Sequence, residues 1–472
     1  MGCALLFLHK KEKILKRYVH KETAEVMPHY GYLGSLYYFA VVRRRKGLAM
    51  ATVDSRRELG GTYASYFLRP IVTISDVEDV KYVLKNIDDF PKEKLPEQVL
   101  TVIRPVFGTE SVGSINNPSW HDHRSIMNKA FTNNKMFFDP LQAKSKQCID
   151  LWKTDQPVLI GSDIQKMTLD ALGSCIFGKD FDSLGGKLAG PLSAYNTIMK
   201  YLLRPYILLF PWTIQLPIPP FNNLRKCIRE FDEACWHFIE ETKQQLAKQI
   251  DSSNLISLMV MNGLPDQAIR DNVGVFFLAG HETTASTLSW ACVMLATHQD
   301  IQTKLRNEIA LKTDNFSRDI TYDDLKDFTY LEYFIKETMR LYPAAPIIGG
   351  RYTLKDCLVG NWFLPKDTSL QFNLISMLQD PHTWDQPLLF DPDRWSPDRL
   401  TKEQRSCWLP FSYGPRICIG MNFSLLEQKI FLCNLLKFRK IELTQGSIVR
   451  IDPSNPIHIP DMKHIAFQFS SY

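Results

Sequence analysis

Apolar residues recur every three or four positions over most of the chain, which is the spacing of one face of an α-helix. This pattern predicts helices in six main stretches, at residues 123–135, 140–154, 163–177, 224–250, 266–312 and 322–342. A β-branched run predicts a strand at residues 71–74, and further extended segments are expected at 351–372 and 440–470. The chain is therefore expected to be mainly α with a small β region.

Five prolines lie between residues 205 and 220. Because proline removes a backbone donor and breaks helices, the sequence predicts a long loop here.

The composition is that of one large globular domain. The chain has 472 residues, of which 45% are hydrophobic and 23% charged, and neither a flexible linker nor an internal repeat divides it. A net charge of +5 over this length is too small to indicate nucleic-acid binding. The ten cysteines are scattered, so most are expected to be reduced thiols of the core.

The N-terminus begins with an apolar run of at most eight residues, whereas about 20 are needed to span a bilayer. Basic residues follow, at positions 10, 11, 13, 16, 17 and 21. A shortened anchor, a helix on the membrane surface and a solvated terminus all remain open. We assign residues 1–28 to a basic segment, a truncated or atypical membrane-association region, and residues 29–472 to the main domain.

The segment FSYGPRICIG at residues 411–420 places a cysteine between two glycines. A metal-binding thiolate needs backbone donors and room for a large planar group, which Gly414 and Gly420 provide around Cys418. Arg416 suits a carboxylate such as a heme propionate, and Phe411 can shield the sulfur from water. A lone cysteine would more often be a core residue, but five suitable positions in ten residues favour a heme-thiolate loop.

This segment resembles the heme-binding loop of the cytochrome P-450 superfamily, in its eukaryotic microsomal-type branch. The resemblance implies a cytochrome P-450 fold with heme b (iron protoporphyrin IX) and Cys418 as the axial ligand of the iron. The thiolate then favours cleavage of the O–O bond.

Residues 273–290 have the length of a buried central helix. A membrane-spanning helix is disfavoured, because polar residues including Glu282 fall at the centre. A zinc-protease site is also disfavoured, because the second histidine is missing. A hydroxyl such as that of Thr283 can bond back to the preceding turn, which predicts a local bulge.

Ala279 and Gly280 leave space above the expected heme. The resemblance implies that Thr283 and Glu282 form the family's acid–alcohol pair. Thr283 would hold water or donate a hydrogen bond in the oxygen-binding space, and Glu282 would relay protons from solvent.

Three charged residues are predicted to form a structural network. Glu337 and Arg340 lie three positions apart on a predicted helix, a spacing usually found on exposed faces. The apolar surroundings and the resemblance instead imply a buried network whose third member is Arg394. Its expected role is to support the chain that leads to Cys418.

Trp120 and Arg124 lie four positions apart, so they share one helix face. By resemblance they contact heme propionates, as does Arg351 at the start of an extended segment. His121 and His123 are expected to be exposed polar residues rather than metal ligands.

These observations lead to one functional prediction: a monooxygenase that inserts an oxygen atom from dioxygen into an apolar small molecule, such as a lipid, sterol, terpenoid or xenobiotic. The alternatives are a heme-thiolate isomerase or peroxygenase, and a non-catalytic heme sensor. Loops near 95–115, 200–220 and 345–350 are expected to shape the pocket, and the second of these to roof it.

The chain continues only to residue 472 after Cys418, which leaves too little for a fused flavin domain. Electrons are therefore expected from NADPH through a separate reductase or comparable flavoprotein. Basic residues near the thiolate loop would suit an acidic partner, namely Lys402, Arg405, Lys429, Lys437, Arg439 and Lys440. The resemblance implies the cytosolic face of the endoplasmic reticulum membrane, with a peripheral membrane contact.

Overall fold

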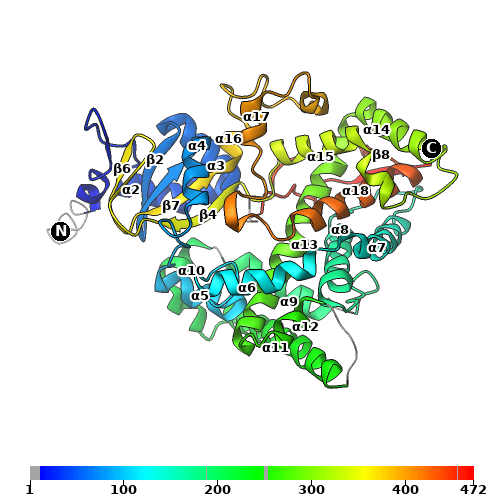
Figure 1. The fold of residues 1–472 in the computed structure, drawn as a ribbon, viewed down its shortest axis with the longest axis horizontal. Coiled ribbons are helices and arrows are strands. Elements are labelled where there is room, and N and C mark those ends of the chain that lie inside the picture. Colours follow the sequence, from blue (N-terminus) through cyan, green and yellow to red (C-terminus); the bar gives the residue numbers. More distant parts are fainter. Residues whose placement is uncertain are drawn as a thin grey trace.

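The computed structural model describes residues 11–187, 189–202, 204–248, 254–453, 455 and 457–471. Figure 1 shows a sheet region on one side and a larger body of helices on the other, with helix α13 (Asp266–Thr297) passing through the middle of the helical body. Two large clusters of buried apolar residues correspond to these regions. The predicted mainly α fold with a small β region is confirmed.

The sheet region is built from segments far apart in the sequence. The largest sheet has the order β2-β3-β7-β4, and its strands β3 and β7 are parallel, with Ile71 opposite Ser369. A second sheet has the order β1-β6-β5, and strands β8 and β9 form a pair. The strand bounds are β1 Val19–His20, β2 Thr62–Phe67, β3 Arg69–Ile74, β4 Ile347–Tyr352, β5 Cys357–Val359, β6 Trp362–Leu364, β7 Ser369–Asn373, β8 Lys440–Leu443 and β9 Phe467–Ser470.

Most predicted helices are present, with different ends. The corresponding helices are α6 Ser119–Asn128, α7 Phe138–Asp150, α8 Gly161–Leu172, α11 Pro219–Ala247, α13, α14 Gln299–Lys312 and α15 Thr329–Leu341. The predicted helix 266–312 is two helices, because the chain leaves helical geometry at His298. The apolar spacing is similar on both sides of this residue and does not mark the break.

Further helices and short helical turns connect these elements. The α-helices are α2 Tyr32–Tyr37, α3 Arg43–Leu59, α4 Val77–Lys85, α5 Glu97–Phe107, α9 Ala189–Leu202, α10 Pro205–Leu209, α12 Leu255–Met261, α16 Leu374–Leu378, α17 Lys402–Cys407 and α18 Met421–Phe438. The π-helices are η1 Tyr38–Val42 and η4 Gly173–Phe177, and the 3-10 turns are η2 Lys129–Phe131, η3 Asn134–Phe137, η5 Pro211–Gln215, η6 Asp323–Lys326, η7 Pro392–Trp395 and η8 Gly414–Arg416.

The prediction of a long loop at 205–220 is wrong. Helix α10, the turn η5 and helix α11 each begin with a proline in their first two positions. Proline is tolerated there because the first N–H groups of a helix have no partner within it. The pocket-shaping loop predicted at 95–115 is likewise largely helix α5, which contains Pro105.

The described part of the predicted 1–28 segment packs onto the sheet region. Strand β1 pairs with β6, and Leu15, Tyr18 and Met27 are almost fully buried there. Residues 1–10, including the apolar run, lie outside the described residues. The boundary at residue 28 stays a prediction.

Candidate functional site

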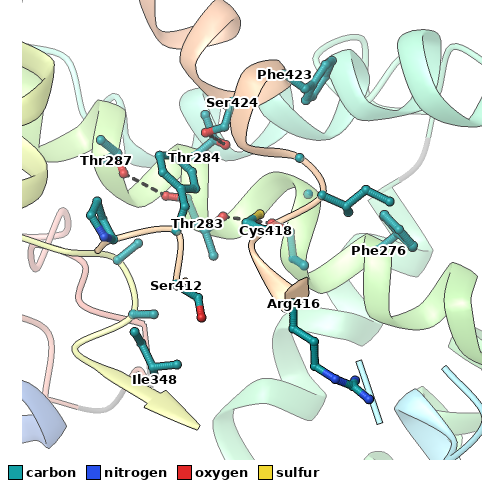
Figure 2. A pocket seen from close by; sticks show the side chains of 18 of the residues that line it. Phe276, Thr283, Thr284, Thr287, Ile348, Ser412, Arg416, Cys418, Phe423 and Ser424 are labelled. Carbon is teal, nitrogen blue, oxygen red and sulfur yellow. Dashed lines mark hydrogen bonds between the residues drawn. The ribbon is translucent and has the colours of Figure 1, made fainter. Parts of the chain in front are cut away.

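A pocket of about 330 Å³ lies where α13, strand β4, helix α18 and the 411–420 loop meet. Figure 2 shows the loop passing helix α13, with Cys418 and Thr283 among the side chains that line the pocket. Predicted site residues from three of these segments, α13, β4 and the loop, line this pocket, namely Ala279, Gly280, Thr283, Arg351, Phe411, Arg416, Cys418 and Gly420. Residues that the sequence pattern places more than 130 positions apart are therefore brought to one site.

The 411–420 loop is fixed by its backbone. The N–H of Cys418 donates a hydrogen bond to the carbonyl oxygen of Phe411 at 2.9 Å. Gly414 has a φ of +73°, and a Cβ at this position would lie 2.7 Å from the carbonyl oxygen of Leu84. Glycine is therefore required here for both conformation and space. Gly420 differs, because no protein atom lies within 4 Å of the position of its Cβ, which leaves room on the pocket side.

The sulfur of Cys418 lies in a mixed environment. Its side chain is accessible because it lines the pocket, but protein surrounds it closely enough for burial to raise the pKa of the thiol. A backbone hydrogen bond from Gly420 and the positive charge of Arg124 lower this pKa in part. Both contacts favour the thiolate, and a bound metal ion would deprotonate it outright.

One edge of the pocket is strongly cationic, with Arg351, Arg416 and Lys92 among its lining residues. Burial is the main cause that lowers the pKa of Arg351 to about 10, of Arg416 to about 9 and of Lys92 to about 7. The other two cations also lower the pKa of Lys92, and Arg351 lowers that of Arg416. Two charged arginines, together with a lysine that is charged in part near pH 7, favour an anionic ligand.

The guanidinium groups at this edge have unused donors. Arg416 donates through Nη2 to the carbonyl oxygen of Ile115 at 2.8 Å and to Oδ1 of Asn116 at 3.3 Å. Within the described part of the chain, Nε and Nη1 of Arg416 and Nε of Arg351 have no hydrogen-bond partner, and no carboxylate pairs with either arginine. Buried donors of this kind are normally satisfied, so they fit a ligand with carboxylates such as heme propionates.

Trp120 and Arg124 lie behind this edge and are not among the pocket-lining residues. The guanidinium of Arg416 lies over the ring of Trp120, 4.4 Å from its centre. Arg124 donates through Nη2 to the carbonyl oxygen of Ile417 at 2.8 Å. Their direct contacts therefore orient Arg416 and the thiolate loop.

The bulge predicted in the central helix is absent, because α13 is continuous over its whole length. The hydroxyl of Thr283 does bond back to the carbonyl oxygen of Ala279 at 2.9 Å, but this bond forms without opening the helix. The irregular turn of this region is instead η4, which directly follows Leu172 of α8. A Cβ on Gly280 would lie 2.5 Å from Leu172, so this glycine permits the close packing of α8 on α13.

The predicted relay of protons from solvent through Glu282 requires contact with solvent, but Glu282 is only 4% exposed and is not a pocket-lining residue. Its carboxylate accepts hydrogen bonds from the hydroxyl of Tyr195 at 2.5 Å and from Nδ2 of Asn455 at 3.1 Å. In this arrangement the acid and Thr283, although adjacent in sequence, face different surroundings.

The three predicted network residues meet in the core. Glu337 and Arg340 are fully buried and form two hydrogen bonds, at 2.8 and 2.9 Å. Arg394 donates to the same carboxylate at 2.9 Å, and Trp395 does so at 3.0 Å. The guanidinium of Arg340 also binds the carbonyl oxygens of Leu378, Pro387 and Leu389, on the chain that leads to the thiolate loop.

Sequence reasoning missed Lys92, Asn116, Tyr195 and Asn455. Asn116 binds the backbone of Lys92 through both atoms of its amide and also accepts from Arg416. None of these residues belongs to a recognisable motif, and their contacts join distant parts of the chain. His121 is exposed as predicted, but His123 is only partly exposed and its Nδ1 is buried, so the prediction is wrong for this residue. The described residues contain no group of His, Cys, Asp and Glu that could hold a metal ion.

Comparison with known proteins identifies the family. The family model for cytochrome P450 matches residues 30–464. The chain is similar to cytochrome P450 3A14 of Cavia porcellus, with 28% identity and 88% of each chain covered, and to cytochrome P450 4F8 of Homo sapiens, with 27% identity over 83% of this chain and 82% of the relative. It is also similar to cytochrome P450 CYP72A613 of Trigonella foenum-graecum, with 28% identity over 83% of this chain and 75% of the relative.

The chain therefore belongs to the cytochrome P450 family. The enzyme class is that of the heme-thiolate monooxygenases, which use heme, dioxygen and a small-molecule substrate. The pocket fits this cofactor, because it combines a cysteine sulfur, a cationic edge with unused donors and a glycine that leaves space.

Proposed function

We propose that Cys418 is the axial ligand of heme iron and that the pocket oxidises an apolar small molecule, such as a lipid, sterol, terpenoid or xenobiotic. The observation that carries this proposal is the position of Cys418 in one pocket with Arg351 and Arg416, which have no carboxylate partner among the described residues. When bound, heme supplies the activation of dioxygen. The chain's own residues hold the group, exclude water and move protons.

The residues that would hold heme are Arg351, Arg416 and Lys92, at the cationic edge of the pocket, where their donors suit its propionates. Trp120 and Arg124 support them from behind. Phe411, at the start of the thiolate loop, lines the pocket, where its ring would shield the sulfur from water once heme is bound.

Thr283 is the pocket-lining hydroxyl that we assign to proton transfer. Its present acceptor is its own helix, so it can redirect its proton by turning about χ1 without breaking a contact to another element. Glu282 is the proposed source of protons, since it is the carboxyl nearest along the chain. Ala279 and Gly280 carry no bulky side chain over the same space.

Electrons are proposed to come from NADPH through a separate flavoprotein reductase. Part of the basic face predicted for this partner is already paired within the chain, because Lys429, Lys437 and Lys440 contact Glu332, Asp319 and Glu442. Lys402 and Arg405 of α17 are exposed, which makes them the better candidates for an acidic partner.

We propose a peripheral contact with the cytosolic face of the endoplasmic reticulum membrane. Large apolar side chains are 37–62% exposed between α10 and the start of α11, namely Tyr206, Phe210, Trp212, Leu216 and Ile218. Exposed aromatic residues of this kind favour a membrane interface. Among the described residues, the structure has no helix with the length and apolar character to cross a membrane.

The function is tested with the full chain in vesicles. Apolar compounds are screened by the absorption change that marks displacement of water from heme iron, and hits are incubated with NADPH, dioxygen and a reductase. The proposal expects NADPH and oxygen consumption together with an oxygenated product. Binding without turnover would indicate a sensor. Rearranged product formed without NADPH would indicate an isomerase, and oxygenated product formed with added hydrogen peroxide in place of NADPH would indicate a peroxygenase.

A further inference from the structure

The cations at the edge of the pocket come from distant parts of the chain. Lys92 precedes α5, Arg351 lies on β4 and Arg416 lies in the turn η8. Their charges oppose one another: besides burial, which is the main cause, Arg351 and Arg416 lower the pKa of Lys92, and Arg351 lowers that of Arg416. Like charges at close range repel, so neutral contacts must hold these groups together before an anion binds.

The side-chain amide of Asn116 joins two of these cations. Its Oδ1 accepts the backbone N–H of Lys92 at 2.7 Å, and its Nδ2 donates to the carbonyl oxygen of the same residue at 3.2 Å. The same Oδ1 accepts a hydrogen bond from Nη2 of Arg416 at 3.3 Å. Because the amide meets both an N–H and a carbonyl group of Lys92, only one orientation of this amide satisfies all three contacts.

These contacts decide which donors of Arg416 stay available. Nη2 is used by Oδ1 of Asn116 and by the carbonyl oxygen of Ile115. The ring of Trp120 covers the guanidinium from one side, with its centre 4.4 Å away. Nε and Nη1 are buried and have no partner among the described residues, so they are the donors that remain for an anion.

The turn that leads to Asn116 is fixed to the central helix. Asp271 of α13 accepts the N–H groups of residues 109 and 110, each at 2.9 Å, and Asn272 accepts that of Val112 at 2.8 Å. The position of Asn116 is therefore set from α13, independently of the cations that it holds.

We propose that Asn116 is a positioning residue that sets the spacing of Lys92 and Arg416 in advance, so that this edge takes a ligand with two neighbouring carboxylates. This inference rests on the proposed function, in which that ligand is heme. Because the repulsion between the cations is overcome when the protein folds, the ligand does not have to draw them together, and more of the interaction energy is available for holding it.

Asn116→Ala tests the inference, because it removes all three contacts and leaves both cations in the chain. Two readouts compare the variant holoprotein with wild type: transfer of heme to excess apomyoglobin, and the resonance Raman band that reports hydrogen bonding to the heme propionates. Heme should be lost about tenfold faster, and the propionate band should move toward that of Arg416→Gln. Asn117→Ala is the matched control, since Asn117 is exposed and donates to Asp88, and it should leave both readouts unchanged.

A purely structural role of Asn116 would give a different result. General loosening of the fold would speed heme loss and lower the urea midpoint without moving the propionate band, and this result overturns the inference. Asn116→Asp is the second variant if Asn116→Ala does not fold. It keeps the acceptor contacts, loses the donor to Lys92 and adds a negative charge beside Arg416, so it should also move the band.

Two arginine variants separate failure of this inference from failure of the proposed function. If Arg351→Gln and Arg416→Gln leave the propionate band as it is in wild type, the cationic edge does not hold the propionates, and the proposed function fails together with the inference. If both arginine variants move the band but Asn116→Ala does not, only the positioning role of Asn116 is wrong.

Discussion

Two regions of the molecule are constructed differently: the thiolate side of the pocket, and the segment of α10, η5 and the first residues of α11 (residues 205–220). We call this segment the lid, and none of its described residues lines the pocket. On the thiolate side, Gly414 packs against Leu84, Cys418 binds the backbone of Phe411, and the Glu337 network lies behind them in the core. On the lid side, α10 and η5 expose aromatic residues, with Trp212 being 62% exposed. The first side is fixed by many buried contacts, and the second leaves apolar surface uncovered.

This difference separates two requirements of the chemistry. A metal ligand must keep one position. Buried charge pairs and a glycine with a positive φ fix that position, so substitutions at these residues are poorly tolerated. A substrate must enter and leave, so a cover of the pocket, which is the role predicted for the lid, cannot be held in the same way. Tyr195 joins α9, which directly precedes the lid in the sequence, to Glu282 of the central helix α13.

Breaking the buried network should have the largest effect on stability. Glu337→Gln leaves Arg340 and Arg394 without a counter-charge, which should lower the free energy of unfolding by about 3–5 kcal/mol. Glu332→Gln is the control on the same helix, since its lysine partners are partly exposed and it should cost under about 1 kcal/mol. Urea unfolding measures both. Equal losses of unfolding free energy in Glu337→Gln and Glu332→Gln would show that burial of the charges does not determine the cost of removing them.

A methyl group at Gly414 should have the next largest effect. Gly414→Ala combines a positive φ with a Cβ 2.7 Å from the carbonyl oxygen of Leu84. Gly446→Ala shares the positive φ, at +88°, but meets no atom within 4 Å. The loop variant should be less stable than this control by about 1–3 kcal/mol and should retain less heme. If the two variants unfold alike, the close approach to Leu84 is not a constraint.

Thr283→Ala should change the products rather than the stability. Heme and substrate should still bind, while the share of NADPH electrons that ends as hydrogen peroxide rises severalfold, because the proton is no longer delivered in place. Thr284→Ala should have the smaller effect, since Thr284 is engaged with Ser424. The measurement is the ratio of oxygenated product to hydrogen peroxide. If Thr283→Ala uses its NADPH electrons for product as fully as the wild type, the proposed role of Thr283 is wrong.

The smallest effect is expected on the lid. Phe210→Ser and Trp212→Ser should each weaken binding to vesicles of zwitterionic and anionic lipid by about 1 kcal/mol, and added salt should weaken it further. Leu311→Ser is the control, since Leu311 is 79% exposed on α14, far from α10 (Figure 1). Co-sedimentation measures binding. A comparable loss for Leu311→Ser, or resistance of the wild-type protein to everything but detergent, would exclude a peripheral lid contact.

The sequence alone predicts site residues correctly where they form a pattern of local spacing. The thiolate loop and the i,i+3 pair of Glu337 and Arg340 are short patterns whose geometry follows from the backbone. The sequence alone does not predict contacts between residues far apart along the chain: Tyr195 and Asn455, which bind Glu282, lie 87 and 173 positions from it.

Two errors have simple physical causes. The prolines between 205 and 220 were interpreted as breaks, although at the start of a helix they are compatible with it. The bulge was expected at Thr283, where back-bonding leaves α13 regular, while the irregular turn lies in η4 across the helix interface.

The central claim is that Cys418 alone supplies the thiolate to heme iron. The most direct measurement is the absorption spectrum of the ferrous carbonyl form of wild-type protein, Cys418→Ser and Cys433→Ser, the last being a buried cysteine of α18. The account predicts the strongly red-shifted Soret band of a thiolate ligand in the wild type and in Cys433→Ser, and its loss in Cys418→Ser. Persistence of that band in Cys418→Ser would contradict the account.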